Sequence, residues 1–320
     1  MKVDMPVSKA KGKINAITIG KDASKGGTRK TTVTIGGGTS MPFIRAEGGT
    51  PNQPRVAMEV HIARPDWQGV AVTELAAVLD DPVAWARAAE REYGAELVCL
   101  KLAAASPEGA NRPVDECVGI AREILKGVGL PLMVYGCGNE EKDAELMSAL
   151  GDFIRNEGCV IGLAENEKFK SRAAAAIAYD AHLVAFSNLD INLAKQLNIL
   201  LLEYGMPGER IIMDPLQGSL GYGVEYSFSV IERIRLAALS GDTTIQMPLV
   251  CDASVGGNYR EAYEPLEAWG SGAIRGVLWE GVTAMSSLVA GADLVIVRCP
   301  TTVKHVKRTI GQMMGIGGGP

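Results

Sequence analysis

The chain has 320 residues, of which 47% are hydrophobic, and its formal net charge at pH 7 is -5. A chain of this length and composition can bury a full core, as one α/β barrel or as two smaller domains. The negative charge and the lack of a long run of Lys or Arg argue against a nucleic-acid partner. The apolar runs are far shorter than the roughly 20 residues that cross a bilayer, and the N-terminus has no apolar signal region. We therefore expect a cytoplasmic protein with no membrane contact.

Residues 1–55 predict an N-terminal extension that contains a β-hairpin. Two β-like segments, GKINAITIG from Gly12 and KTTVTIGGG from Lys30, are joined by a loop that contains glycine. Such a hairpin could plug the bottom of a barrel or reach a neighbouring chain.

Eight continuous apolar runs follow. They begin at Val56, Leu97, Pro131, Cys159, His182, Arg210, Thr244 and Asp293. Runs that do not alternate with polar residues are typical of parallel strands buried on both faces. Each run is therefore predicted to be a strand of a parallel sheet.

The segments between these runs carry helix signals. The segment from Asp81 to Gly94 begins with an Asp cap and Pro and ends at Gly, Asp190 is a predicted cap, and TTVKHVKRTIGQMM from Thr301 predicts a last helix. Eight strand–helix units predict an α/β fold, a (β/α)8 TIM barrel over residues 56–314, because closure removes both sheet edges. An open doubly wound sheet is the alternative. Residues 315–320 predict a flexible tail.

In such a barrel, the residues that follow the strands line the working face. We predict a cofactor-binding set from these positions: Asn139, Glu165, Asn188, Asp190, Asp214, Gln217, Gly218, Tyr222 and Asp252. Glu165 and Asp214 could act as an acid–base pair, but carboxylates at a barrel rim also cap helices. His61 has the place of a general base but no partner that the sequence identifies. No catalytic residue is therefore predicted.

The cysteines and histidines do not predict a metal site in this chain. The six cysteines form no C-x-x-C pair and no Cys/His cluster with ligand spacing. The stretch from Asp180 to Ala185 approaches the Asp-x-His-x-x-Gly signature of cobalamin-binding domains, but Ala replaces the final Gly. His182 also begins a strand at the barrel bottom, so we interpret it as structural. Any metal is expected to come with a partner or a cofactor.

Several segments resemble the small (delta) subunit family of the corrinoid/iron–sulfur protein in the acetyl-CoA synthase/decarbonylase (Wood–Ljungdahl) system. The segments are GGTRKTTVTIGGG from Gly26, PEGANRPVDECV from Pro107, LDINLAKQLNILL from Leu189, DPLQGSLGYGVEYSFSVIERIRLAAL from Asp214 and RGVLWEGVTAMSSLVAGAD from Arg275. Their polar and glycine positions match in order, as well as their hydrophobic pattern. The resemblance covers most of the chain.

The resemblance implies a non-catalytic barrel subunit in a heterodimer. In the family, the large subunit carries an iron–sulfur cluster and a cobalamin-type corrinoid, which rests at the interface against the barrel of the small subunit. Its cobalt takes a methyl group from methyltetrahydrofolate or a related pterin, through a pterin-dependent methyltransferase, and delivers it to acetyl-CoA synthase. A reductive activator is a further possible partner. The iron–sulfur cluster is expected on the partner only.

A pterin-dependent methyltransferase is the alternative. These enzymes share the barrel, and some carry an Asp-Pro-Leu after a strand, as at Asp214, Pro215 and Leu216. The acidic residue holds the pterin ring in those enzymes. The stretch QGSLGYG from Gln217 is more similar to the corrinoid protein, so the carrier subunit is the preferred interpretation.

Overall fold

The computed structural model describes residues 7–44 and 46–315. The strands are β1 (Ala16–Ile19), β2 (Val33–Gly36), β3 (Arg55–His61), β4 (Leu97–Lys101), β5 (Leu132–Tyr135), β6 (Val160–Ala164), β7 (His182–Phe186), β8 (Ile211–Asp214), β9 (Val250–Asp252) and β10 (Leu294–Val297). The α-helices are α1 (Val70–Glu74), α2 (Pro82–Ala88), α3 (Val114–Gly127), α4 (Glu140–Ile154), α5 (Phe169–Ala178), α6 (Ile191–Glu203), α7 (Val224–Leu239), α8 (Arg260–Tyr263), α9 (Gly272–Ala290) and α10 (Pro300–Met313). Every helix in the described ranges is too short or too polar to cross a membrane. Residues 316–320 of the predicted tail lie outside these ranges.

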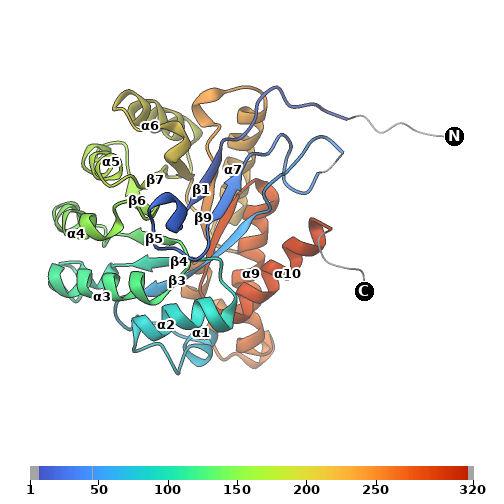
Figure 1. The fold of residues 1–320 in the computed structure, drawn as a ribbon. Helices are drawn as coiled ribbons and strands as arrows, with labels where there is room; N and C mark the ends of the chain where they lie inside the picture. Colours follow the sequence, from blue (N-terminus) through green and yellow to red (C-terminus); the bar gives the residue numbers. More distant parts are fainter. Residues whose placement is uncertain (1–6, 45, 316–320) are drawn as a thin grey trace.

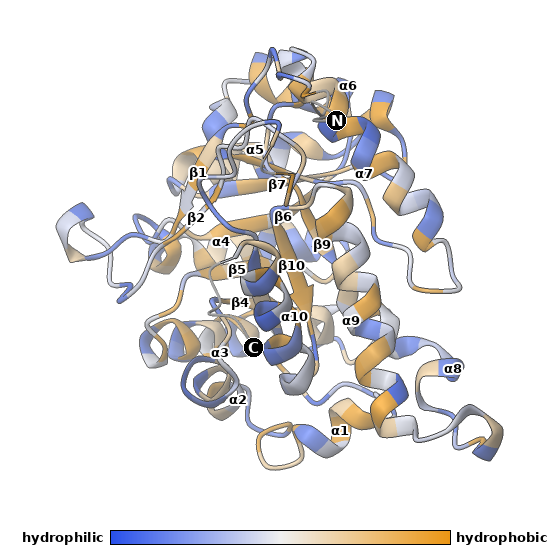
Figure 2. Cartoon of the chain, turned by 90° about the vertical axis from the view of Figure 1, so that its right-hand side faces the viewer, coloured by the Kyte–Doolittle hydropathy of each residue, from blue (hydrophilic) through white to orange (hydrophobic). Residues whose placement is uncertain are grey.

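Eight parallel strands form a barrel with helices around it (Figure 1). The strands pair in the order β8-β7-β6-β5-β4-β3-β10-β9, and a parallel bridge between Met213 and Leu249 connects the two ends. Figure 2 shows hydrophobic residues along the barrel strands, as their burial on both faces requires. The predicted (β/α)8 barrel is confirmed.

The seventh barrel strand is shorter than the apolar run predicted. Residues Thr243–Ile245 form a short 3-10 helix, whose cap Asp242 accepts a hydrogen bond from the backbone N of Thr244 at 3.1 Å. Pro248, which has no N–H to give to a sheet, precedes the strand. Only Val250–Asp252 are left to form β9.

The predicted helix caps are confirmed. Asp81 Oδ1 accepts hydrogen bonds from the backbone N of Val83 and Ala84, both at 3.0 Å, and Pro82 begins α2. Asp190 Oδ1 accepts from the backbone N of Asn192 at 2.7 Å. These side chains satisfy backbone donors that the first helical turn leaves free.

The N-terminal hairpin closes the bottom of the barrel. Strands β1 and β2 pair antiparallel and lie across the barrel in Figure 1. The buried hairpin side chains share one core cluster with inward-facing strand residues: Ile17, Ile19, Val33 and Ile35. At this end His182 Nε2 lies 3.0 Å from the carbonyl oxygen of Thr18, and burial lowers the pKa of His182 to about 4. His182 therefore has the structural place that the sequence predicted.

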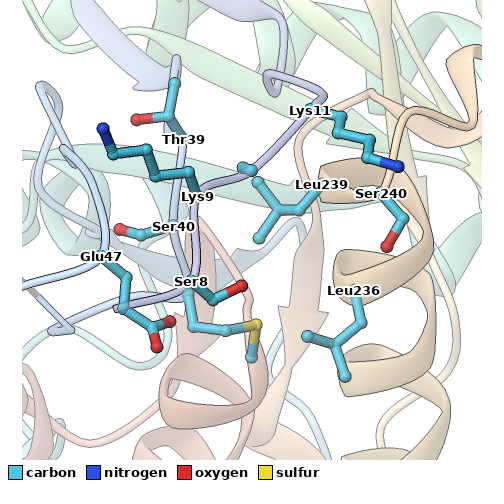
Figure 3. Close-up of a pocket in the computed structure, with 11 residues that line it drawn as sticks. Ser8, Lys9, Lys11, Thr39, Ser40, Glu47, Leu236, Leu239 and Ser240 are labelled. Atoms are coloured by element: carbon cyan, nitrogen blue, oxygen red, sulfur yellow. The ribbon is translucent and has the colours of Figure 1, made fainter. Parts of the chain in front are cut away.

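The segment before the hairpin packs on the end of α7. The backbone N atoms of Lys11 and Gly12 donate to the carbonyl oxygen of Leu239 at 2.9 and 2.8 Å. A cavity of about 260 Å³ lies between this segment, residues 39–47 and the end of α7, where Figure 3 places Lys9 and Glu47 on one side and Leu236 on the other. Helix α7 runs opposite to the strands, so its last residues lie at the barrel bottom. The cavity is therefore away from the C-terminal ends of the strands, where the working face is expected.

Candidate functional site

A buried carboxylate organises the barrel mouth. Glu59 lies inside β3, and its side chain has no exposed surface. Arg298 Nε lies 2.5 Å from its Oε1, and Lys101 Nζ lies 2.5 Å from its Oε2. Burial raises the pKa of Glu59, but the charges of Lys101 and Arg298 hold it well below its usual range. Glu59 is therefore ionised and shared between two cations.

Lys101 connects Glu59 to the end of β9. Its Nζ lies 2.7 Å from Asp252 Oδ2. Ser254 Oγ lies 2.6 Å from Asp252 Oδ1 and 3.0 Å from Glu59 Oε2. Burial lowers the pKa of Lys101, but Asp252 and Glu59 raise it above its ordinary value. Two carboxylates and a hydroxyl thus fix the ammonium group, which stays charged.

Aromatic rings enclose the other side of the network. Arg298 Cζ lies 3.8 Å from the centre of the Trp67 ring, a cation–π contact. His61 stacks on Trp85 with ring centres 6.1 Å apart, and its Nε2 lies 3.3 Å from Glu59 Oε2. His61 is therefore a partner of Glu59, and its ring centre also lies 5.0 Å from that of Trp67, the ring that Arg298 contacts.

Asp214 and Tyr135 lie buried at the ends of β8 and β5. Asp214 Oδ1 accepts a hydrogen bond from the backbone N of Leu216 at 3.0 Å. Burial, with a smaller contribution from Asp252, raises the pKa of Asp214 to about 7. The hydroxyl of Tyr135 is buried and has no hydrogen-bond partner, and burial raises the pKa of Tyr135. Near neutral pH, Asp214 can therefore hold or release a proton.

Replacing Asp214 with asparagine is expected to make the protein relatively more stable as the pH rises. The pKa of Asp214 in the folded protein, about 7, lies above the ordinary value of 3.8 for an aspartate, so the wild-type protein loses stability as the pH rises between these two values. Asparagine keeps the acceptor oxygen and has no charge to bury. The free energy of unfolding of the Asp214→Asn variant, relative to that of the wild-type protein, should rise by at least about 1 kcal/mol between pH 4 and 8. Urea titrations at each pH measure it, with exposed Asp152→Asn as the control, and a difference that is constant with pH would contradict this account.

A cleft of about 330 Å³ opens beside the network at the ends of β4, β5 and β6. Its lining includes Lys101, Tyr135, Cys137, Glu165 and Arg172. Asp143 links two segments of the cleft wall and makes that wall rigid. Its Oδ2 lies 2.9 Å from Arg172 Nη2, and its Oδ1 accepts a hydrogen bond from the backbone N of Cys137 at 2.6 Å. The cleft is therefore polar, preformed and continuous with the charged network.

Four of the predicted site residues lie at the mouth. Glu165 lines the cleft and is exposed, and Asn188, just after β7, is exposed as well. Asp252 belongs to the charged network, and Asp214 is buried beneath it. Glu165 and Asp214 thus have different surroundings, one facing solvent and one in the barrel interior.

Asn139 and Asp190 are helix caps. Asn139 Oδ1 accepts a hydrogen bond from the backbone N of Lys142 at 3.0 Å and begins α4, as Asp190 begins α6. Both caps stand on the rim, and their contact with a cofactor stays a prediction.

The residues of the loop after β8 contact one another, α9 and the segment after β9. Gln217 Oε1 accepts a hydrogen bond from Ser287 Oγ in α9, and its Nε2 donates to the carbonyl oxygen of Gly218 at 2.6 Å. A Cβ on Gly218 would lie 2.6 Å from the backbone carbon of Gly223, so the turn itself requires glycine here. Tyr222 stacks on Tyr259 with ring centres 3.8 Å apart, which joins this loop to the segment after β9.

Sequence reasoning missed two residues of this site, Glu59 and Tyr135. A carboxylate inside the apolar run VAMEVHI was the available signal, because such a group is rarely buried without a partner. Strand β3 lies between β4 and β10. Lys101 is the last residue of β4, and Arg298 directly follows β10. Neighbouring parallel strands thus bring the three groups together.

The six cysteines do not form a cluster. Five are buried and Cys137 is half-buried, and burial raises the pKa of the Cys99, Cys159 and Cys299 thiols. In the described ranges 7–44 and 46–315, no group of three or more His, Cys, Asp or Glu side chains could hold a metal ion.

Solved structures similar to this chain include dihydropteroate synthases. The enzyme from Xanthomonas albilineans with 4-aminobenzoic acid has a TM-score of 0.57 at 15% identity and covers 88% of this chain and 100% of its own. The enzyme from Coxiella burnetii in complex with pteroic acid has a TM-score of 0.55 at 12% identity and covers 85% of this chain and 98% of its own. At this identity the likeness establishes the barrel fold alone.

Sequence relatives are much closer. The acetyl-CoA decarbonylase/synthase complex subunit delta of Archaeoglobus fulgidus is 34% identical over 317 residues, which cover 96% of this chain and 70% of the relative. The corresponding subunit of Methanopyrus kandleri is 36% identical over 305 residues, which cover 94% and 76%. The family model of the CO dehydrogenase/acetyl-CoA synthase delta subunit matches residues 16–304, from the hairpin to α10. The chain belongs to the CO dehydrogenase/acetyl-CoA synthase delta subunit family.

Proposed function

We propose that this chain is the barrel subunit of a heterodimeric corrinoid/iron–sulfur methyl carrier. Its mouth would lie against a corrinoid that the larger subunit carries, and the iron–sulfur cluster would belong to that larger subunit. A bound corrinoid would supply a cobalt able to carry a methyl group from a methylated pterin, through a methyltransferase, to acetyl-CoA synthase. Family membership supports this role, because the relatives are named as subunits of an acetyl-CoA decarbonylase/synthase complex.

The observation that carries the proposal is the mutual neutralisation of the charged groups at the mouth. Glu59 lies between Lys101 and Arg298, and Asp252 lies 2.7 Å from Lys101. Charges that are paired with one another leave little net field for binding a small charged substrate. A large, flat ligand with amide side chains is better suited to such a floor.

Three groups at the mouth have hydrogen-bonding capacity that fits corrin amides. The Tyr135 hydroxyl is buried at the cleft without a partner, and Glu165 and Asn188 are exposed on the rim. A hydroxyl and an amide can both donate and accept, and a carboxylate accepts. We infer that these three residues hold and orient the edge of the corrin, while the paired charges below them keep a fixed polar floor.

A pterin-dependent methyltransferase remains a second candidate because of Asp214. This buried carboxyl stands at the end of β8, where the sequence Asp-Pro-Leu recurs in such enzymes, and it could hold a pterin ring. The other acidic groups nearby are engaged, since Asp252 lies against Lys101 and Glu59 against Arg298. The arrangement therefore offers a pterin one buried carboxyl that is not in an ion pair.

The test compares mouth variants in the complex with the larger subunit. Tyr135→Phe removes one unpartnered hydroxyl, so the fold should persist, but the complex should lose corrinoid about ten-fold faster on dilution, the effect of roughly one hydrogen bond. Glu165→Gln should shift the corrinoid absorption spectrum, and exposed Glu145→Gln on α4 is the control. Identical spectra and retention for all variants would count against the proposal. Binding of methyltetrahydrofolate by the chain alone, with methylation of free cobalamin, would favour the methyltransferase.

A further inference from the structure

Helix α9 carries a row of exposed apolar side chains. Ile274, Leu278, Val282 and Val289 are 64%, 56%, 46% and 42% exposed. Their spacing of four, four and seven residues places them on one face of the helix. The opposite face is buried and includes Gly276, Glu280, Thr283 and Ser287. Scattered apolar residues are normal on a surface, but a continuous row marks a site of contact.

Two hollows flank this row, which we call the α9 ridge (Ile274, Leu278, Val282 and Val289). The larger hollow, about 490 Å³, lies between α9, Phe228 of α7 and residues of α10. The smaller one, about 310 Å³, lies between α9, Leu220 and the segment 269–271. Leu278 and Val282 line both hollows, so the ridge stands between two grooves. Ridges and grooves of this kind are the geometry by which helices pack on one another.

The rim beside the larger hollow is basic. Helix α10 contains no acidic residue, and its exposed positions include Lys304, His305 and Arg308. His305 and Arg308 line the hollow directly. Figure 2 looks onto this side, with hydrophobic colour along α9 and hydrophilic colour along α10. An apolar floor with a cationic rim complements a helix that has an apolar stripe and an acidic flank.

We propose that the α9 ridge is a docking surface for an amphipathic, acid-flanked helix of the larger subunit. The ridge spans residues 274–289, about 24 Å of helix axis, which matches about four turns of a partner helix. Gly281 adds no Cβ between Leu278 and Val282, so a partner backbone can approach closely there. A second copy of this chain would offer the same basic α10 beside its ridge in place of an acidic flank. This inference rests on the heterodimer of the proposed function and does not require a corrinoid at the barrel mouth.

The experiment measures assembly of this chain with the larger corrinoid/iron–sulfur subunit by native mass and light scattering. Leu278→Glu combined with Val282→Glu should weaken the association at least 100-fold, because two charges would replace the apolar contact. Arg308→Glu should weaken it about ten-fold and reduce its salt dependence. Ile199→Glu combined with Leu202→Glu on α6, at 41% and 39% exposure, is the matched control and should assemble normally.

Hydrogen exchange of the unmodified proteins supplies a measurement that does not depend on the folding of variants. The exposed face of the 274–289 segment should gain protection in the complex, and a cross-link from a photoreactive group at position 278 should identify an acidic, amphipathic helix. Normal assembly of the double variant, or unchanged exchange in α9, would overturn the proposal. A homodimer of this chain that the double variant dissociates would assign the ridge to a second copy and equally overturn it. Assembly through α9 together with an unchanged corrinoid spectrum and retention in the Tyr135 and Glu165 variants would contradict the proposed function and leave this inference standing.

Discussion

Replacing Glu59 with glutamine should lower the free energy of unfolding by about 3–5 kcal/mol, the usual cost of removing one partner from a buried ion pair. The amide keeps the shape of the side chain but leaves Lys101 and Arg298 without their shared negative charge. Both cations are largely buried, at 18% and 4% side-chain exposure, so solvent cannot replace that charge. Urea denaturation at pH 7 measures the loss.

The control for Glu59 is the exposed pair of Glu116 with Arg112, whose carboxylate is 48% exposed. Glu116→Gln should change the free energy of unfolding by less than about 1 kcal/mol. The sign of the pH dependence supplies a second check. The pKa of Glu59 is depressed below 4.5, so its contribution is present above that pH and is lost as the pH falls further. Equal effects of the two substitutions would contradict the central place given to Glu59.

Replacing Arg29 with alanine should also cost about 3–5 kcal/mol, because it strips several buried acceptors of their donor. Arg29 Nε lies 2.9 Å from Glu157 Oε2, and its Nη1 and Nη2 donate to the carbonyl oxygens of Val128 at 2.8 Å and Leu125 at 2.6 Å. Both charged side chains are almost fully buried. The substitution should loosen the hairpin from the barrel bottom as well as lower global stability.

Thermal and urea unfolding measure the Arg29 effect, and hydrogen exchange in β1 and β2 reports the loosening. Lys25→Ala, at an exposed position in the same hairpin loop, should be nearly neutral. Arg29→Lys should recover only part of the loss, because an ammonium group cannot bridge a carboxylate and two carbonyl groups as the guanidinium does. A lysine variant as stable as wild type would show that charge alone matters at this position.

The barrel itself could be predicted because its signals are local. Strands buried on both faces leave continuous apolar runs, and helix starts carry side chains such as Asp81 and Asp190 that accept from the next backbone N–H groups. The prediction at β9 was too long for a local reason as well. The residues Ile245, Met247 and Leu249 are buried, but Asp242 and Pro248 give part of this run a turn in place of a strand.

The centre of the candidate site could not be predicted because its partners are far apart in the sequence. Glu59 and Arg298 are separated by 239 positions, and Lys101 comes from a third strand. Attention to strand ends identified Asp252 and Asp214 but passed over a carboxylate inside a strand. The glycines after Asp214 had an explanation that only the folded loop reveals, since Gly218 packs against the backbone of Gly223.

The most direct test of the proposed function is the absorption spectrum and cobalt content of this chain alone, of the larger subunit alone, and of their one-to-one complex. We predict that cobalt and corrinoid absorbance stay with the larger subunit, and that adding this chain shifts the spectrum without adding cobalt. The shift should saturate at equal amounts of the two chains. An unchanged spectrum on complex formation would contradict the proposal that the barrel mouth covers the corrinoid.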